Sequence, residues 1–196
     1  RQMCIRDSSY VVGNYVGKVA LAAVGASTPI INMLIGFFMG ISTGAGVVIA
    51  QFFGAGNTCK MKRAIHNSIA LTLVMGVVLT IVGLLFNDPI LKAIGVPSEV
   101  FSEASTYLSI YFWSLIFVMV YNMGSGILRS VGDSKRPLYF LIFSSVVNII
   151  LDFLFVKYFH FGVAGAGYAT LIAQAISAIM VMYVLMKTED DYKVIL

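Results

Sequence analysis

Five apolar segments, each about as long as a lipid bilayer is thick, dominate this sequence. They cover about residues 21–50 (with an apolar centre from Ile30), 65–86, 107–128, 138–156 and 163–186. A membrane-spanning helix needs about 20 mostly apolar residues. Only 11% of the residues are charged, whereas soluble domains contain about a quarter. The sequence therefore predicts an all-α integral membrane protein, a bundle of five transmembrane helices.

The basic residues between these segments predict how the chain crosses the membrane. Because lysine and arginine are enriched in cytoplasmic loops, the side with more of them is expected to be cytoplasmic. The net charge of +4 is therefore attributed to membrane topology, and no nucleic-acid partner is expected. The richer side carries eight basic residues, Lys60, Lys62, Arg63, Arg129, Lys135, Arg136, Lys187 and Lys193, and the other side carries Lys18, Lys92 and Lys157.

The first eight residues differ in character from the rest of the chain. The stretch RQMCIRDS is polar and charged, and it abuts an apolar segment without a loop. Residues 1–8 are therefore interpreted as a non-native segment, and residues 9–196 as the native part of the sequence. Five helices would leave the native N-terminal end outside the cell, so a further helix is expected before residue 9.

Asp152 is the only acidic residue inside any of the five segments. An aspartate at the centre of a membrane helix costs about 2.5–3.5 kcal/mol on insertion scales. Asn148 and Ser145 precede it on the same helical face, so the stripe is expected to face the bundle interior or a water-filled cavity. There Asp152 could exchange a proton, or hold Na⁺ together with other oxygen ligands. The alternative is that Asp152 reaches water at the outer interface, because Lys157 follows it closely.

Two other segments carry polar residues at helical spacing. Convergence of these residues with Asp152 on one cavity is a hypothesis. The alternative is a set of separate hydrogen bonds between helices, each worth about 0.6 kcal/mol. The residues are Thr170, Gln174 and Ser177 on the last segment, and Tyr121, Asn122 and Ser125 on the third.

Small residues recur every four positions on two segments. They are Gly36, Gly40 and Gly44 on the first, and Ala166, Thr170 and Gln174 on the last. Small residues at this spacing let helix backbones approach closely. Both faces are therefore predicted to pack against neighbouring helices.

No arrangement typical of an enzyme is found. The sequence has no Ser/His/Asp triad and no zinc-ligand spacing. His66 and His160 are interpreted as interfacial residues, and Cys59 as a reduced thiol. No enzyme activity and no organic cofactor are expected.

Three longer stretches resemble one family of transporters. Residues 21–56 read LAAVGASTPIINMLIGFFMGISTGAGVVIAQFFGAG, residues 128–156 read LRSVGDSKRPLYFLIFSSVVNIILDFLFV, and residues 162–174 read GVAGAGYATLIAQ. They are similar to the second helix, the fourth-to-fifth helix region and the sixth helix of the multidrug and toxic compound extrusion family. The resemblance implies that residues 9–196 are part of the N-terminal lobe of a twelve-helix, two-lobe transporter and contain its helices 2–6, without its first helix and C-terminal lobe. It also implies cation-coupled export of small organic, often cationic, compounds by alternating access in the plasma membrane, here the inner membrane of a bacterium.

The resemblance further implies a cation site on four positions. A carboxylate and an asparagine of the family's fifth helix match Asp152 and Asn148, a sixth-helix threonine matches Thr170, and a fourth-helix asparagine matches Asn122. The family's first-helix aspartate has no counterpart in register, since Asp7 lies one residue away from that position. The coupling ion is expected to be H⁺ or Na⁺, with no other metal. The cavity is expected to be lined by Ser145, Gln174, Ser177 and Tyr121.

Two other functions fit the same architecture. A lipid-linked oligosaccharide flippase of the same superfamily is expected to have a strongly basic cavity, whereas the five segments contain no lysine or arginine. A non-transporting membrane scaffold subunit is expected to tolerate Asp152→Asn without effect. Both alternatives remain open at the level of sequence.

Overall fold

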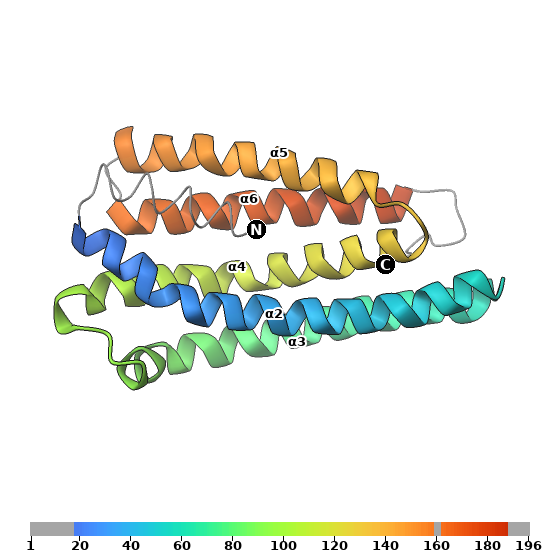
Figure 1. Cartoon of the computed structure of the whole chain (residues 1–196), viewed down its shortest axis with the longest axis horizontal. Coiled ribbons are helices and arrows are strands. Elements are labelled where there is room, and N and C mark those ends of the chain that lie inside the picture. The colour runs from blue at the N-terminus through green and yellow to red at the C-terminus, as the bar shows by residue number, and fades with distance from the viewer. Residues whose placement is uncertain (1–17, 159–161, 188–196) are drawn as a thin grey trace.

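The computed structural model describes residues 18–158 and 162–187, and this part of the chain consists of long helices joined by short turns (Figure 1). All five candidate spans are long and apolar enough to cross a membrane, with η1 continuing the span of α5. The all-α membrane fold predicted from the sequence is confirmed. The helices are α2 (Lys18–Gly54), α3 (Thr58–Ala93), α4 (Ser98–Ser130), α5 (Lys135–Asp152), the π-helix η1 (Phe153–Tyr158) and α6 (Gly162–Lys187).

The helices extend beyond the apolar segments that predicted them. The predicted loop from Asn87 onward is helical as far as Ala93, with Pro89 inside the last turns of α3. Hydropathy identifies only the apolar part of a helix, the part that can lie in the hydrocarbon layer. The helix itself is longer, because its backbone hydrogen bonds continue through polar residues until a turn ends them. One such turn follows α4, where Gly132 has a φ of 91° and the amide of Asp133 donates to the carbonyl of Leu128 at 2.9 Å.

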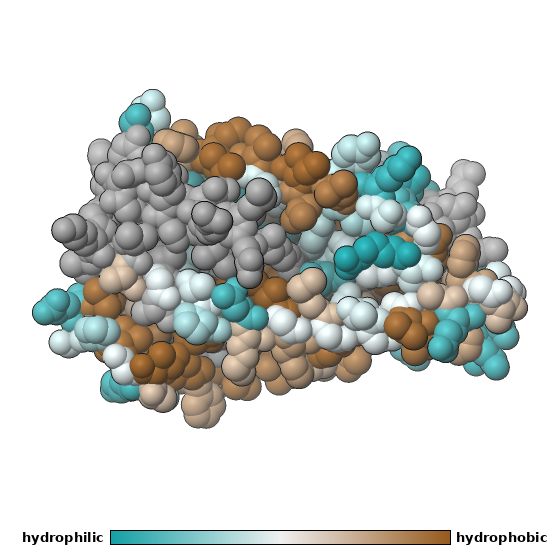
Figure 2. Space-filling model, in the orientation of Figure 1, coloured by the Kyte–Doolittle hydropathy of each residue, from teal (hydrophilic) through white to brown (hydrophobic). Residues whose placement is uncertain are grey.

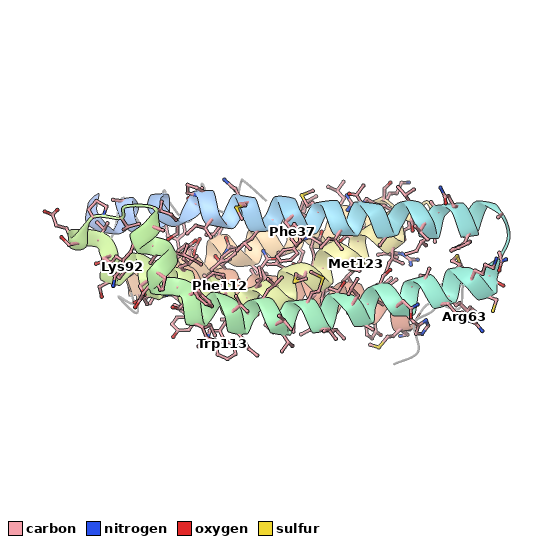
Figure 3. All side chains as sticks on the ribbon, turned by 90° about the horizontal axis from the view of Figure 1, so that it is seen from below. Phe37, Arg63, Lys92, Phe112, Trp113 and Met123 are labelled. Carbon is pink, nitrogen blue, oxygen red and sulfur yellow. The ribbon has the colours of Figure 1, made fainter. Side chains whose placement is uncertain are left out.

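The polypeptide alternates direction, so α2, α4 and α6 end where α3 and α5 begin (Figure 1). We call this the basic end, because seven of the eight residues on the basic side of the sequence lie on these helix ends. Figure 3 shows Arg63 at the basic end and Lys92 at the opposite end. Lys193 lies outside the described residues.

Helix α4 forms the core of the bundle. It packs against α2, α3 and α6, whereas α5 packs mainly against α6. In α4, 61% of the apolar window is buried, compared with 17–33% in the other four spans. The outer helices therefore present apolar faces to their surroundings, as the hydrophobic residues along α5 show in Figure 2.

Small residues on α3 create the close contact with α4. Thr80 Oγ1 lies 3.1 Å from the carbonyl oxygen of Phe112 on α4. A β-carbon at Gly76 would lie 3.0 Å from Ile116, and one at Gly83 would collide with the ring of Phe112. Figure 3 shows Phe112 inside the bundle. The contact face of α3 includes the buried residues Thr72, Gly76, Thr80, Gly83 and Asn87.

The glycine face predicted on α2 does not form such a contact. A β-carbon at Gly36, Gly40 or Gly44 would meet no atom within 4 Å. The prediction that these glycines pack against a neighbouring helix is therefore wrong for the part of the chain that the structure describes. On α6 the predicted face begins with Ala166, which is fully buried in the hydrophobic core.

Replacement of Asn87 should weaken the α3–α4 contact. Asn87 Nδ2 donates to the carbonyl of Ser105 at 2.9 Å and lies 2.6 Å from Ser109 Oγ. Asn87→Leu should lower the free energy of unfolding by about 1–2 kcal/mol, since interhelical hydrogen bonds contribute about 0.6 kcal/mol each. Unfolding in mixed micelles of increasing SDS content measures this loss. Asn67→Leu is the matched control on an exposed position of α3 and should change little; equal losses in both variants would contradict the assigned role.

Candidate functional site

Asp152 is fully buried at the last position of α5. Its side chain is 0% exposed, which excludes the alternative that it reaches water at the outer interface. Asn148 and Ser144 are also buried and precede it at intervals of four residues. The predicted polar stripe on this helix therefore faces inward. Its buried serine is Ser144, whereas Ser145 is only partly buried.

Polar contacts connect this face of α5 to α6. Asn148 Nδ2 lies 3.5 Å from Thr170 Oγ1, and the Thr170 hydroxyl donates to the carbonyl of Ala166 at 3.0 Å. Ser144 Oγ donates to the carbonyl of Ala173 at 3.0 Å. Among the described residues, no donor contacts the buried Oδ1 atom of Asn148. One turn of helix before the carboxylate, the side chains of Asn148 and Thr170 thus bring an amide oxygen and a hydroxyl oxygen, and oxygen ligands are those that hard cations prefer.

Helix α4 contributes a residue that the sequence analysis did not identify. Tyr107 is buried, and its hydroxyl is close enough to Asp152 and Tyr111 to interact with them electrostatically. Asp152 therefore lies within the bundle, near a side chain of α4, rather than against lipid. The sequence does contain a signal for this residue, since Tyr107 and Tyr111 are four residues apart and therefore lie on one face of the third apolar segment.

The backbone changes its hydrogen-bonding pattern directly after Asp152. Residues Phe153–Tyr158 form the π-helix η1, a helix type defined by bonds from an amide to the carbonyl five residues earlier. π-Helical turns are rare and are often found at functional sites. The carboxylate is thus held at the junction between two helix types.

The polar residues of α4 near the basic end form a separate cluster. The hydroxyl of Tyr121 donates to the carbonyl of Pro137 at 2.9 Å, so Tyr121 lies beside the start of α5. Asp152 is 15 residues farther along that span, which corresponds to roughly 22 Å of helix. Asn122, next to Tyr121, is therefore not brought together with Asp152, Asn148 and Thr170. The expected convergence on one cavity is not observed for the residues predicted on α4, because Tyr121, Asn122 and Ser125 lie near the opposite end of the bundle from Asp152.

The remaining candidates on α6 have local roles. Ser177 is buried, and its hydroxyl donates to the carbonyl of Ala173 at 3.1 Å within the same helix. Gln174 is partly buried. Neither has a described contact with Asp152.

Other predicted features are easily placed. Cys59 is a free, exposed thiol, and His66 Nδ1 lies 2.8 Å from the carbonyl oxygen of Lys62. Within residues 18–158 and 162–187, no group of three His, Cys, Asp or Glu side chains could hold a metal ion. Asp7, His160 and the segment of residues 1–8 lie outside the described residues.

Comparison with known proteins gives one consistent result. A family model described as MatE matches residues 8–154. The probable multidrug resistance protein YoeA of Bacillus subtilis (strain 168) is 36% identical over 180 residues, covering 90% of this chain and 39% of the relative. The chain thus spans about two fifths of that relative's length.

Solved structures of transporters show the same arrangement of helices. One is described as the inward-facing conformation of a multidrug resistance MATE family transporter of the MOP superfamily. It has a TM-score of 0.92 at 29% identity and covers 98% of this chain and 44% of that one. Another, described as the outward-facing conformation of such a transporter, has a TM-score of 0.90 at 29% identity and covers 97% and 42% of the two chains. Relatives and structural neighbours are transporters rather than enzymes.

Proposed function

The chain belongs to the MatE family, and from this premise we propose that it forms part of a multidrug efflux antiporter driven by H⁺ or Na⁺. Relatives named as multidrug resistance proteins support the multidrug activity. One observation carries the proposed coupling site: a fully buried carboxylate, Asp152, follows Asn148 by one turn of helix, and the Asn148 side chain contacts the hydroxyl of Thr170. The five apolar spans support a multi-pass membrane protein, and the bacterial relatives support a location in the plasma membrane.

The energetics of burial explain why such a carboxylate would bind a cation. An isolated charge in a low-dielectric interior is strongly unfavourable, so the site gains free energy when the charge is neutralised or paired. A proton would neutralise Asp152 directly. Na⁺ would instead be bound by Asp152 together with Asn148 Oδ1 and Thr170 Oγ1. In both cases one cation binds at the same residue, Asp152.

Exchange of this cation for a drug would drive transport. In the outward-open state, cation binding at Asp152 displaces a small organic substrate, often itself cationic, and favours return to the inward-open state. Such a shift requires the cation to bind the two states with different affinity. This segment resembles both the inward-facing and the outward-facing structures, with TM-scores of 0.92 and 0.90. That similarity supports alternating access in which the segment moves largely as one unit.

The flippase alternative expects a strongly basic cavity. Among the described residues, Arg129 is the one basic side chain that lines the two cavities beside the basic end of α4. A single arginine favours drug export over the binding of a polyanionic lipid-linked sugar. The scaffold alternative is separated from transport by the Asp152 variant discussed below.

Replacement of Thr170 should distinguish the two coupling ions. Thr170→Val removes one oxygen beside Asn148 while preserving the shape of the side chain. If Na⁺ is the driving ion, its apparent affinity should fall about tenfold, the effect of losing one favourable contact to a charge. If H⁺ drives efflux, the dependence on the proton gradient should be nearly unchanged. Efflux of a fluorescent cationic dye from proteoliposomes, under an imposed Na⁺ or H⁺ gradient, measures both.

Thr72→Val is the matched control for this experiment. Thr72 on α3 donates to the carbonyl four residues earlier at 2.7 Å, as Thr170 does, but it lies on the α3–α4 contact face. Efflux by this variant should keep its ion dependence. Unchanged Na⁺ affinity in Thr170→Val, in a protein whose efflux requires Na⁺, would exclude Thr170 as a ligand.

A further inference from the structure

A groove lies at the basic end of the bundle, away from Asp152. A cavity of about 340 Å³ lies between α2 and α4, and one of about 460 Å³ lies between α2, α4 and α5. Both are lined by Met39, Asn122 and Arg129, so we treat them as one basic-end groove. Figure 2 shows hydrophilic residues gathered between α5 and α2 toward this end. Cavities of a few hundred Å³ are typical of sites for small organic molecules.

One face of α4 supplies hydrogen-bond donors to the groove. Asn122, Ser125 and Arg129 are spaced three and four residues apart, so they lie along the same side of the helix. Asn122 is 6% exposed and Ser125 is 3% exposed. Among the described residues, the Nδ2 atom of Asn122 and the Oγ atom of Ser125 have no hydrogen-bond partner. Because buried donors without acceptors are unfavourable, this arrangement is suited to a ligand that brings acceptors.

Arg129 adds a positive charge to these donors. Its Nε atom donates to the carbonyl of Ser125 at 3.1 Å, which holds the guanidinium beside the groove. Among the residues that the structure describes, no acidic side chain lines either cavity. Asp133, at the turn after α4, is engaged with Arg136 at 3.2 Å. The described lining of the groove therefore carries a positive charge without a carboxylate to balance it.

Most of the other hydroxyl groups of the groove donate within the protein, and the remaining one, that of Ser134, is exposed. Ser42 Oγ donates to the carbonyl of Asn122 at 2.7 Å, and Thr43 Oγ1 donates to the carbonyl of Met39 at 2.7 Å. Ser130 Oγ donates to the carbonyl of Ile127 at 2.7 Å. The buried donors that remain are thus those of Asn122 and Ser125, beside the guanidinium of Arg129. Apolar walls surround them, formed by Met39, Val47, Leu138 and Leu141.

We propose that the basic-end groove binds an oxyanion, a carboxylate or phosphate group carried on an apolar body, through Asn122, Ser125 and Arg129. Oxyanions accept several hydrogen bonds at once, and arginine binds them with charge assistance. The apolar walls would contact the rest of the ligand. The oxyanion could belong to a free amphipathic compound or to the headgroup of an anionic lipid. This site goes beyond the proposed coupling function, because it uses neither Asp152 nor its neighbours.

Binding to the purified full-length protein tests this proposal. The soluble probe is 4-phenylbutyrate, compared with the neutral 4-phenylbutanamide, and titration calorimetry gives each Kd. Arg129→Gln should raise the Kd for 4-phenylbutyrate about 10- to 100-fold, and Asn122→Leu about 10-fold, with little effect on the weak binding of the amide. Arg136→Gln is the matched control, since Arg136 lies at the same end of the bundle and is not among the described residues that line the groove. The Kd of this variant for 4-phenylbutyrate should equal that of the unmodified protein.

A second arm identifies the source of the oxyanion. Nanodiscs of phosphatidylcholine containing phosphatidylglycerol are used, and the phosphatidylglycerol retained on the protein is counted by native mass spectrometry. Retention that depends on Arg129 and Asn122, without binding of 4-phenylbutyrate, assigns the groove to a lipid headgroup. Binding of the soluble anion assigns it to a free compound. If neither probe responds to Arg129→Gln and Asn122→Leu, the proposal is overturned.

Two further variants keep the result interpretable. Ser125→Ala removes one buried hydroxyl with minimal change of shape and should raise the Kd for 4-phenylbutyrate severalfold. It is the test to use if Arg129→Gln does not fold. Asp152→Asn should leave binding of both probes unchanged. Loss of efflux with retained anion binding would therefore separate the groove from the coupling site.

Discussion

Asp152→Asn is expected to abolish cation-driven efflux, lowering its rate at least about 100-fold, while the protein still inserts and folds. Asparagine has nearly the same shape as aspartate, but it can neither take up a proton nor offer a negative charge to Na⁺. Loss of a charged contact worth about 3 kcal/mol corresponds to this change in rate. Efflux of a fluorescent cationic dye from proteoliposomes under an imposed ion gradient is the measurement. Yield and unfolding in SDS should match those of the unmodified protein.

Asp88→Asn provides the control for removal of an acid near the same end of the bundle. Asp88 is exposed on α3 and accepts a hydrogen bond from Ser105 Oγ at 2.8 Å. This variant should retain efflux. If the protein is a non-transporting scaffold, neither substitution should have an effect. Normal efflux by Asp152→Asn would refute the coupling role assigned to the Asp152 carboxylate.

Gly83→Val is expected to cause the largest loss of stability, about 3 kcal/mol or more. Even a β-carbon at this position would collide with the ring of Phe112, which is 3% exposed and enclosed by the core. The ring cannot move aside, so α3 and α4 must separate, and overpacking of this kind is strongly destabilising. The free energy of unfolding in SDS and the yield of folded protein should both fall.

A matched glycine separates this effect from helix propensity. Gly54 is the last residue of α2, and a β-carbon there would meet no atom of the described residues within 4 Å, so Gly54→Ala should be close to neutral. Gly83→Ala combined with Phe112→Leu should be less destabilised than the sum of the two single variants. Simple additivity of the two losses would show that Gly83 and Phe112 are not in contact.

The fold and the buried acid could be predicted because lipid imposes simple rules on sequence. Apolar length identified five spans, and the shared face of Asn148 and Asp152 predicted an inward orientation. Which serine joins that face could not be predicted. In an ideal helix Ser145 lies about 20° from Asp152 and Ser144 about 80°, yet Ser144 is buried because α6 packs along its side. The neighbouring helix determines the width and direction of the buried face.

Long-range pairing was the other information missing from the sequence. Asn122 is polar and helical like Asn148, but only the antiparallel pairing of α4 with α5 shows that they lie at different levels. The packing face of α3 was visible in principle, since Thr72, Gly76, Thr80, Gly83 and Asn87 are spaced by three or four residues. The glycine pattern on α2 appeared stronger by spacing alone, although nothing described lies against it.

The unequal lengths of the helices set the depth of each site in a bilayer. Helix α4 has 33 residues, about 50 Å at 1.5 Å per residue, whereas the hydrocarbon layer is about 30 Å thick. If α4 is centred, its last turns extend about 10 Å into the headgroup layer, and Arg129 stands there among water and counterions. The groove would then exchange its occupant with bulk solution directly, and its affinity would weaken as ionic strength rises.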